Sequence, residues 1–299
     1  SSMALGLGIV VYWATQSGPA AAIVSAFKSR VIADGGTVES PSCAKSDVKF
    51  LLDNPVPSAF TGLLNDYSGA AAAYSLRLLD NTYTGDAIKV RRSSDNAEQD
   101  IAFVNNELDT AALETFAGAG DAFVTTWYDQ SGNGYDMAQA TASNQPQIVS
   151  SGTSFGYVKT FNTQRLATSS NLWLDGVDYS IFGVMKNLGN NLFISGNGDG
   201  YSAVSADGNG SVGSHFFTEG DRYKNGSLIG ATWGDMYNAT TSFAAMSLYA
   251  TKIGANVQGS LGGYITSYNN SELKEYIVYP NQTISRTGVE NNIITHYGF

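Results

Sequence analysis

Cysteine is nearly absent from this sequence. The single cysteine, Cys43, has no second cysteine with which to form an internal disulfide. A small scaffold stapled by disulfides is therefore excluded, and the fold must be stabilised by burial of apolar side chains. We expect such a chain to be synthesised in the cytoplasm.

Charged residues are also scarce, and the basic ones form no cluster. Sixteen Lys and Arg stand against 26 Asp and Glu, which gives a net charge of −10. Proteins bind phosphate backbones through clustered cations, so no nucleic acid partner is expected. The apolar run at residues 4–13 is far shorter than the roughly 20 residues of a membrane helix, so no membrane partner is expected either.

Several motifs for cofactors and metals are missing. The sequence has no Walker-type phosphate-binding loop, no His-Glu-x-x-His zinc motif and no paired cysteines. His215 and His296 are its two histidines, too few for a convincing zinc site or histidine triad. We predict no cofactor. Calcium is the alternative, since the loops at 129–136 and 197–209 are rich in oxygen ligands.

Glycine and aromatic residues are plentiful. The 33 glycines, 17 tyrosines and 43% hydrophobic residues are typical of short strands joined by tight turns. Pro55 and Pro57 mark a boundary near residue 60. Residues 1–60 are predicted to form an apolar strand and short helices that serve attachment or assembly. Residues 61–299 predict an all-β antiparallel sandwich of meander or jelly-roll topology.

Runs of alternating or β-branched residues locate the strands. Asp129 to Gly134 predicts a chain reversal and Asn225-Gly226 predicts a hairpin turn. A C-terminal helix is predicted from the capping-box spacing of Thr287 and Glu290 and from an apolar face. That face comprises Val289, Ile293 and Tyr297. The predicted strands are 87–91, 123–128, 178–184, 191–195, 201–205, 222–224, 243–251 and 274–279.

Carboxylates and aromatic rings are the candidate site residues. Glycoside hydrolysis needs two carboxyl groups across a cleft, and the central loops offer Glu219, Asp221 and Asp235. With 26 acidic residues in the chain, ordinary surface charge is the favoured explanation for these three. Tryptophans could stack on sugars, although a Trp on an alternating strand usually belongs to the core. Besides Trp173, the candidate carbohydrate-binding residues are Trp127, Asp129, Asn133, Tyr223 and Trp233.

Three stretches, Ala73 to Arg77, Ile88 to Asn96 and Trp127 to Gly134, resemble the catalytic-domain family of α-L-arabinofuranosidase B. The resemblance extends over roughly residues 67–299 and implies a concanavalin A-like jelly-roll sandwich. It puts Glu219 at the position of the family's nucleophile and Asn256 at that of its general acid. Asparagine cannot donate a proton as a carboxylic acid does, and the family's disulfide cysteines are absent.

Other stretches resemble different proteins. Residues 26–37, with Cys43 downstream, resemble the N-terminal part of tailed-phage structural proteins that carry such a sandwich. Residues 222–227, and residues 264–265 together with 279–280, resemble the hairpin and closing strand of laminin-G-like modules. These resemblances imply a virion location, other virion proteins as partners and a host-surface glycan as ligand.

Two hypotheses follow. The favoured one is a non-enzymatic phage virion structural or appendage protein, homo-oligomeric, whose sandwich binds glycans or protects the particle. The alternative is an α-L-arabinofuranosidase-like glycoside hydrolase that uses Glu219 or Asp221. Two carboxylates facing each other in a cleft would favour the hydrolase.

Overall fold

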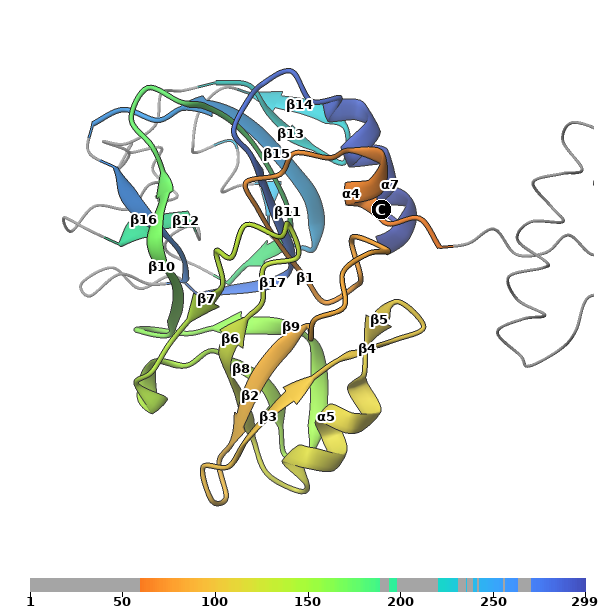
Figure 1. Ribbon diagram of the computed structural model, residues 1–299, viewed down its shortest axis with the longest axis vertical. Coiled ribbons are helices and arrows are strands. Elements are labelled where there is room, and N and C mark those ends of the chain that lie inside the picture. Colours follow the sequence, from red (N-terminus) through yellow and green to blue (C-terminus); the bar gives the residue numbers. More distant parts are fainter. Residues whose placement is uncertain are drawn as a thin grey trace, which may run out of the picture. The chain divides into compact units, whose positions relative to one another are not determined.

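The computed structural model describes residues 60–188, 194–197, 220–230, 235, 239–240, 242–254, 256–262 and 270–299 (Figure 1). The predicted N-terminal strand and helices and the predicted strand at 201–205 lie outside the described residues, and the boundary at residue 60 stays a prediction.

Antiparallel strands dominate the described chain. The strands before residue 150 are β1 (Ala72–Ser75), β2 (Ile88–Arg92), β3 (Glu98–Ile101), β4 (Phe103–Val104), β5 (Glu107–Leu108), β6 (Ala122–Trp127), β7 (Met137–Ala138) and β8 (Gln147–Ser150). Those that follow are β9 (Thr153–Thr160), β10 (Arg165–Trp173), β11 (Asp178–Asn187), β12 (Ile194–Asn197), β13 (Arg222–Lys224), β14 (Ser227–Gly230), β15 (Ala244–Thr251), β16 (Val257–Gly262) and β17 (Ser271–Tyr279). The described helices are α4 (Leu63–Asp66), α5 (Thr110–Ala117), a 3₁₀ turn at Ala142–Asn144 and α7 (Arg286–Tyr297).

Fifteen of the described strands form one large sheet, and β4 and β5 form a separate two-stranded pair. The order of the large sheet is β12-β16-β10-β7-β6-β8-β9-β17-β11-β15-β13-β14, with β1 beside β17 and the β2–β3 pair beside β6. Side chains from strands far apart in this order, such as Trp173 of β10 and Leu248 of β15, share one hydrophobic core. The sheet therefore packs against itself as two layers, which confirms the predicted all-β sandwich.

The layer formed by β1, β17, β11 and β15 is covered on both faces. Along β11, Ile181 points into the core between the layers, whereas Phe182 and Val184 belong to a second cluster with α4 and α7. This arrangement explains why residues 181–185 read as a continuous apolar run instead of an alternating one. We call the face that carries α7 the outer face.

Helix α7 packs on the outer face as predicted, but it begins earlier than the capping-box spacing indicates. Ser285 is the N-cap, and its hydroxyl accepts a hydrogen bond from the N–H of Gly288 at 3.3 Å. Val289 and Ile293 are buried against the sheet. Glu290 is also buried. Its carboxylate accepts hydrogen bonds from Arg286 and from the hydroxyl of Ser247, and these offset the cost of burying a charge.

Both predicted turns are present. Asn225 and Gly226 have φ values of 47° and 80°, the left-handed pair that a two-residue hairpin needs, and they join β13 to β14. The chain also reverses after Trp127, since β6 and β7 are antiparallel neighbours.

A buried ion pair fastens the segment after β1 to β17. The guanidinium of Arg77 donates two hydrogen bonds to Glu275, from Nε at 2.7 Å and from Nη2 at 2.9 Å. Glu275 is fully buried and also accepts a hydrogen bond from Ser75 at 2.8 Å. Asn292 of α7 accepts a further hydrogen bond from Arg77 at 2.9 Å. This network joins β1, β17 and α7.

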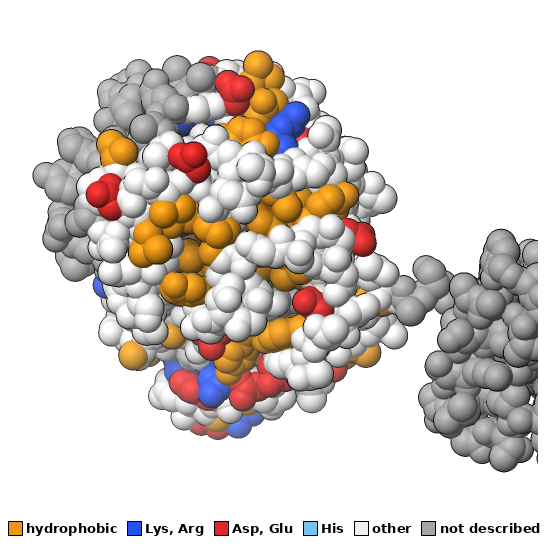
Figure 2. Space-filling view, turned by 45° about the horizontal axis from the view of Figure 1, so that its top comes forward, with side chains coloured by type: hydrophobic (Ala, Val, Ile, Leu, Met, Phe, Trp, Pro, Cys, Tyr) orange, Lys and Arg blue, Asp and Glu red, His pale blue; other side chains and the backbone are white. Residues whose placement is uncertain are grey.

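The visible surface separates apolar from charged side chains. Figure 2 shows hydrophobic side chains gathered across the middle of one face, and acidic and basic side chains gathered together at its lower end. In the described part of the chain, none of the helices has the length and apolar character for a membrane crossing.

Candidate functional site

The Trp127 to Gly134 motif fastens the chain to β1. The carboxylate of Asp129 is 5% exposed. It accepts hydrogen bonds from the N–H groups of Ala73 at 2.8 Å, Ser131 at 2.9 Å and Tyr135 at 3.0 Å. The hydroxyl of Ser131 donates a fourth at 2.8 Å. The carboxylate therefore holds its own loop closed and binds it to a strand 56 residues away.

Gln130 extends the same attachment. Its side-chain oxygen accepts a hydrogen bond from the N–H of Leu79 at 2.7 Å. Its amide nitrogen donates to the carbonyls of Ser75 at 3.2 Å and Arg77 at 3.0 Å. Because Gln130 is buried and its amide is fully engaged, we assign it a structural role.

The predicted sugar-binding residues of this motif are also engaged within the protein. Trp127 and Trp173 are both fully buried, so neither indole face is open to a sugar. Both tryptophans belong to the sandwich core, so the hypothesis that they are exposed in a sugar-binding groove is wrong. Asn133 lies at the surface, yet its amide donates to the carbonyls of Ala70 at 2.9 Å and Ala71 at 3.1 Å.

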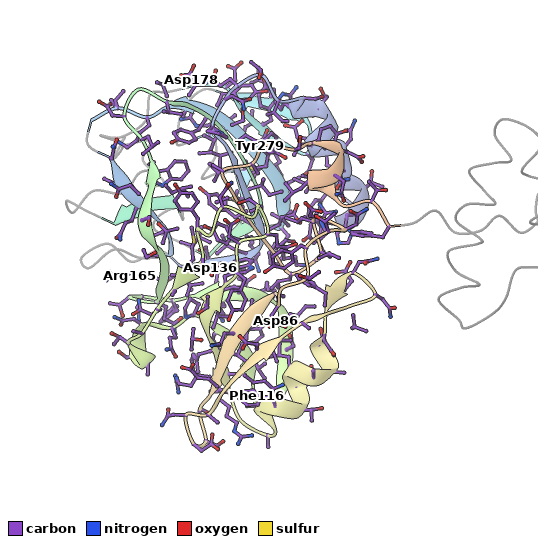
Figure 3. The ribbon with its side chains drawn as sticks, viewed as in Figure 1. Asp86, Phe116, Asp136, Arg165, Asp178 and Tyr279 are labelled. Carbon is purple, nitrogen blue, oxygen red and sulfur yellow. The ribbon has the colours of Figure 1, made fainter. Side chains whose placement is uncertain are left out.

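The oxygen-rich loop 129–136 is held by protein donors. The carboxylate of Asp129 is occupied as described above, and that of Asp136 accepts the N–H of Asp129 at 2.8 Å. Figure 3 shows Asp136 and Asp86 in the central part of the domain. Among the described residues, no group of three or more His, Cys, Asp or Glu side chains is arranged to hold a metal ion. Most of the other calcium candidate, 197–209, lies outside them.

Several polar residues lie at one end of β11, β13 and β15. The first residue of β11, Asp178, pairs with the last of β15, Thr251. On the other side of β15, Tyr249 donates its N–H to the carbonyl of Asp221, directly before β13. We call Asp175, Asp178, Asp221, Tyr249, Lys252 and Asn256 the strand-end cluster. Figure 3 shows Asp178 at this end, near the top.

Asn256 and Asp175 lie together in the strand-end cluster. The side-chain oxygen of Asn256 accepts a hydrogen bond from the N–H of Asp175 at 2.7 Å. The two loops are also joined by a backbone hydrogen bond, which the N–H of Gly176 donates to the carbonyl of Lys252 at 2.8 Å. Burial lowers the pKa of Lys252, and the nearby Asp175 carboxylate opposes this shift. The position assigned to a general acid by resemblance thus has an exposed carboxyl group beside it.

Asp221 and Tyr223 form the part of the cluster that β13 carries. Asp221 is exposed, and its carboxylate accepts a hydrogen bond from the hydroxyl of Tyr223 at 3.3 Å. The guanidinium of Arg286 lies 3.6 Å from the centre of the Tyr223 ring. Burial raises the pKa of Tyr223, and the positive charge of Arg286 opposes this rise. At most one face of this ring is left for a sugar.

The residues that support Tyr223 were not among the predicted site residues. Arg286 forms an ion pair with Glu290, one turn later in α7, and Tyr249 packs edge-on against Tyr223 at 6.5 Å. The i, i+4 spacing of Arg286 and Glu290 is a readable signal for such a pair. Its link to β13 depends on how α7 docks, which spacing does not reveal.

Other predicted residues are placed apart or not at all. Glu219, Trp233 and His215 lie outside the described residues, and Asp235 is partly exposed beside Gly230. His296 lies in the last turn of α7, where its Nε2 is 3.3 Å from a carboxylate oxygen of Glu107. Burial lowers the pKa of His296, an effect that Arg77 reinforces. His296 is far along the helix from the residues that contact β13.

Comparisons with known proteins agree on one family. The family model "Alpha-L-arabinofuranosidase B, catalytic" matches residues 66–227. A crystal structure of an arabinofuranosidase complexed with arabinofuranosyl-α-1,2-xylobiose is similar over 78% of this chain, with 16% identity and a TM-score of 0.52. A mutant GH54 α-L-arabinofuranosidase soaked with 4-nitrophenyl α-L-arabinofuranoside is similar over 75%, with 14% identity and a TM-score of 0.50.

The chain spans 64% and 62% of those two solved chains, which is less than two thirds of their length. At such low identity the likeness shows the fold alone, an arabinofuranosidase-like glycoside hydrolase fold. No curated protein matches this sequence.

The favoured hypothesis of a phage virion structural or appendage protein is therefore wrong. Both the family match and the similar structures are arabinofuranosidases, and nothing among them is a phage protein or a laminin-G-like module. The resemblance that led to it rests on residues 26–37 and Cys43, which lie outside the described residues. The virion location, homo-oligomeric state and glycan partner were argued from the same hypothesis and stay untested.

Because the family model matches more than half of this chain, the chain belongs to the α-L-arabinofuranosidase B catalytic-domain family.

Proposed function

We propose that this domain is a glycoside hydrolase that cleaves α-L-arabinofuranosyl linkages. The observation that carries the proposal is the family match over residues 66–227, a range that includes both Glu219 and Asp221. The similar solved structures support it, since both are arabinofuranosidases, one complexed with arabinofuranosyl-α-1,2-xylobiose and one soaked with 4-nitrophenyl α-L-arabinofuranoside.

The chemistry requires a nucleophile and a proton donor. We assign the nucleophile to Glu219, as the resemblance to the family implies. Its carboxylate attacks the anomeric carbon while a second carboxyl group protonates the leaving oxygen, and water then releases the sugar. Asp221, two residues further on, remains the alternative nucleophile.

We assign the proton donor to Asp175 in place of Asn256. Asn256 has no acidic proton, and its side-chain oxygen is already hydrogen-bonded to the N–H of Asp175. The Asp175 carboxyl is exposed at the strand-end cluster, where Asp221 also lies. The neighbouring loop residue thus supplies the acid that the aligned position lacks.

Leaving groups of different basicity test this assignment. We expect the full chain to hydrolyse both 4-nitrophenyl and methyl α-L-arabinofuranoside. Asp175→Asn should slow hydrolysis of the methyl glycoside by about 10²–10⁴-fold, the usual contribution of a general acid. It should slow the 4-nitrophenyl glycoside much less, because 4-nitrophenolate leaves without protonation.

Asp66→Asn serves as the control, because Asp66 is exposed at the end of α4. It should leave both rates unchanged. Equal rates of Asp175→Asn and the unmodified chain on the methyl glycoside would rule out Asp175 as the acid. No turnover of either glycoside by the unmodified chain would contradict the proposed function itself.

A further inference from the structure

A group of aromatic and basic side chains lies at the opposite end of the same strands from the strand-end cluster. We call Phe155, Tyr157, Lys159, Lys186, Phe243 and Lys274 the aromatic–lysine surface. Lys186 is near the end of β11, and Phe243 directly precedes β15. All six side chains are partly exposed.

Strand register places these residues on the outer face. Lys159 of β9 pairs with Glu272 of β17, and Lys186 of β11 pairs with Glu272 from the other side. Their neighbours Val158, Leu273 and Met185 point the other way, into the sandwich core. Because side chains alternate along a strand, the three paired residues form one row across the outer face.

The rings form a continuous cluster within this surface. Phe155 and Tyr157 are stacked, with ring centres 5.3 Å apart, and Tyr157 lies 5.4 Å from Phe243. Lysine ammonium groups lie over these rings. That of Lys159 is 5.5 Å from the centre of Phe155, and those of Lys274 and Lys186 are 4.8 and 5.9 Å from the centre of Phe243. Cation–π attraction therefore holds three like charges close together.

Negative charge in this surface is insufficient to balance the lysines. Glu272 is 6% exposed at its side chain and pairs with Lys186 at 3.1 Å. Among the described residues, neither Lys159 nor Lys274 has an ion pair with a carboxylate. A local excess of positive charge on a chain with a net charge of −10 indicates a surface that attracts an anion.

We propose that the aromatic–lysine surface binds an acidic polysaccharide, with Lys159 and Lys274 contacting uronate carboxylates and the aromatic rings contacting sugar rings. The choice of a carbohydrate rests on the proposed function, whereas the need for an anion rests on the lysines. The overall negative charge of the chain repels any polyanion along the rest of the surface, so it does not separate a uronate polymer from a nucleic acid, and the test below includes RNA for this reason.

Binding of polygalacturonate, measured by affinity electrophoresis of the full chain, tests the proposal. We expect Lys274→Ala and Lys159→Ala each to weaken binding about tenfold, which corresponds to about 1.4 kcal/mol. The matched control is Lys89→Ala, since Lys89 lies on β2 and forms its own ion pair with Asp100. It should bind as the unmodified chain does. Binding should also weaken as salt rises from 50 to about 500 mM, because salt screens charges.

Three results would overturn the proposal. They are equal binding by Lys274→Ala and Lys89→Ala, equal affinity for carboxyl-reduced polygalacturonate, and tighter binding of single-stranded RNA. Turnover of 4-nitrophenyl α-L-arabinofuranoside by the lysine variants separates this proposal from the proposed function. That neutral substrate should be hydrolysed at unchanged rates, and its turnover does not depend on polysaccharide binding.

Discussion

Replacement of Asp129 with alanine is expected to lower the free energy of unfolding by about 2–4 kcal/mol. The substitution removes the acceptor for three backbone N–H groups and one hydroxyl. The N–H of Ala73 lies in a fully buried strand, where an unpaired donor costs roughly 1–3 kcal/mol. The donors of Ser131 and Tyr135 are nearer the surface and can regain part of this energy from water.

Urea unfolding followed by circular dichroism measures the effect of Asp129→Ala. The exposed carboxylate of Asp66 again provides the matched control, because an exposed substitution typically changes stability by less than about 0.5 kcal/mol. A loss for Asp129→Ala no larger than that for Asp66→Ala would mean that the motif does not anchor β1.

Replacement of Arg77 with methionine is expected to destabilise the fold by about 3–5 kcal/mol. Removing one member of a buried ion pair leaves the other charge without compensation, and Glu275 is fully buried. The hydroxyls of Ser75 and Tyr297 would still donate to Glu275, but they cannot neutralise it. Glu275→Leu alone should cost a similar amount, because in the described part of the chain it leaves Arg77 with Asn292 as its one side-chain acceptor.

The double variant Arg77→Met/Glu275→Leu distinguishes a buried charge from simple loss of packing. With both charges gone, no buried ion is left unpaired, so the double variant should be more stable than either single variant. The urea midpoints of all four proteins complete the cycle. Additive losses in the double variant would show that the two side chains act independently.

Much of the fold could be predicted from local sequence patterns. The predicted strands at 87–91, 123–128 and 222–224 correspond closely to β2, β6 and β13, because apolar alternation and the Asn225-Gly226 turn are local signals. Strands β9 and β10 were missed, since residues 153–173 are rich in Thr, Ser and Asn. Strand β9 pairs with its local neighbour β8 and with β17, and β10 pairs with β7 and with β16; the partners β17 and β16 are more than 80 residues away.

The roles of individual polar residues could not be predicted in the same way. Asp129 and Asn133 stand in a glycine-rich turn, a pattern that suits a ligand site and a structural loop equally well. Only the partners on residues 70–79 distinguish the two, and these depend on the docking of β1. The neighbourhood of Asn256 and Asp175 is likewise invisible in sequence, because two separate loops bring them together.

Helix α7 illustrates how a correct element can carry a wrong detail. The Thr287 and Glu290 spacing indicated a capping box, whereas Ser285 caps the helix and Glu290 is buried against Ser247. Both arrangements use the same residue types, and the tertiary contact with β15 decides between them.

The release of 4-nitrophenol from 4-nitrophenyl α-L-arabinofuranoside tests the proposed activity most directly. We predict that the full chain releases it and that Glu219→Gln, correctly folded by circular dichroism, does not. Release by Glu219→Gln at the unmodified rate would contradict the assigned nucleophile, and absence of release from the unmodified chain would contradict arabinofuranosidase activity.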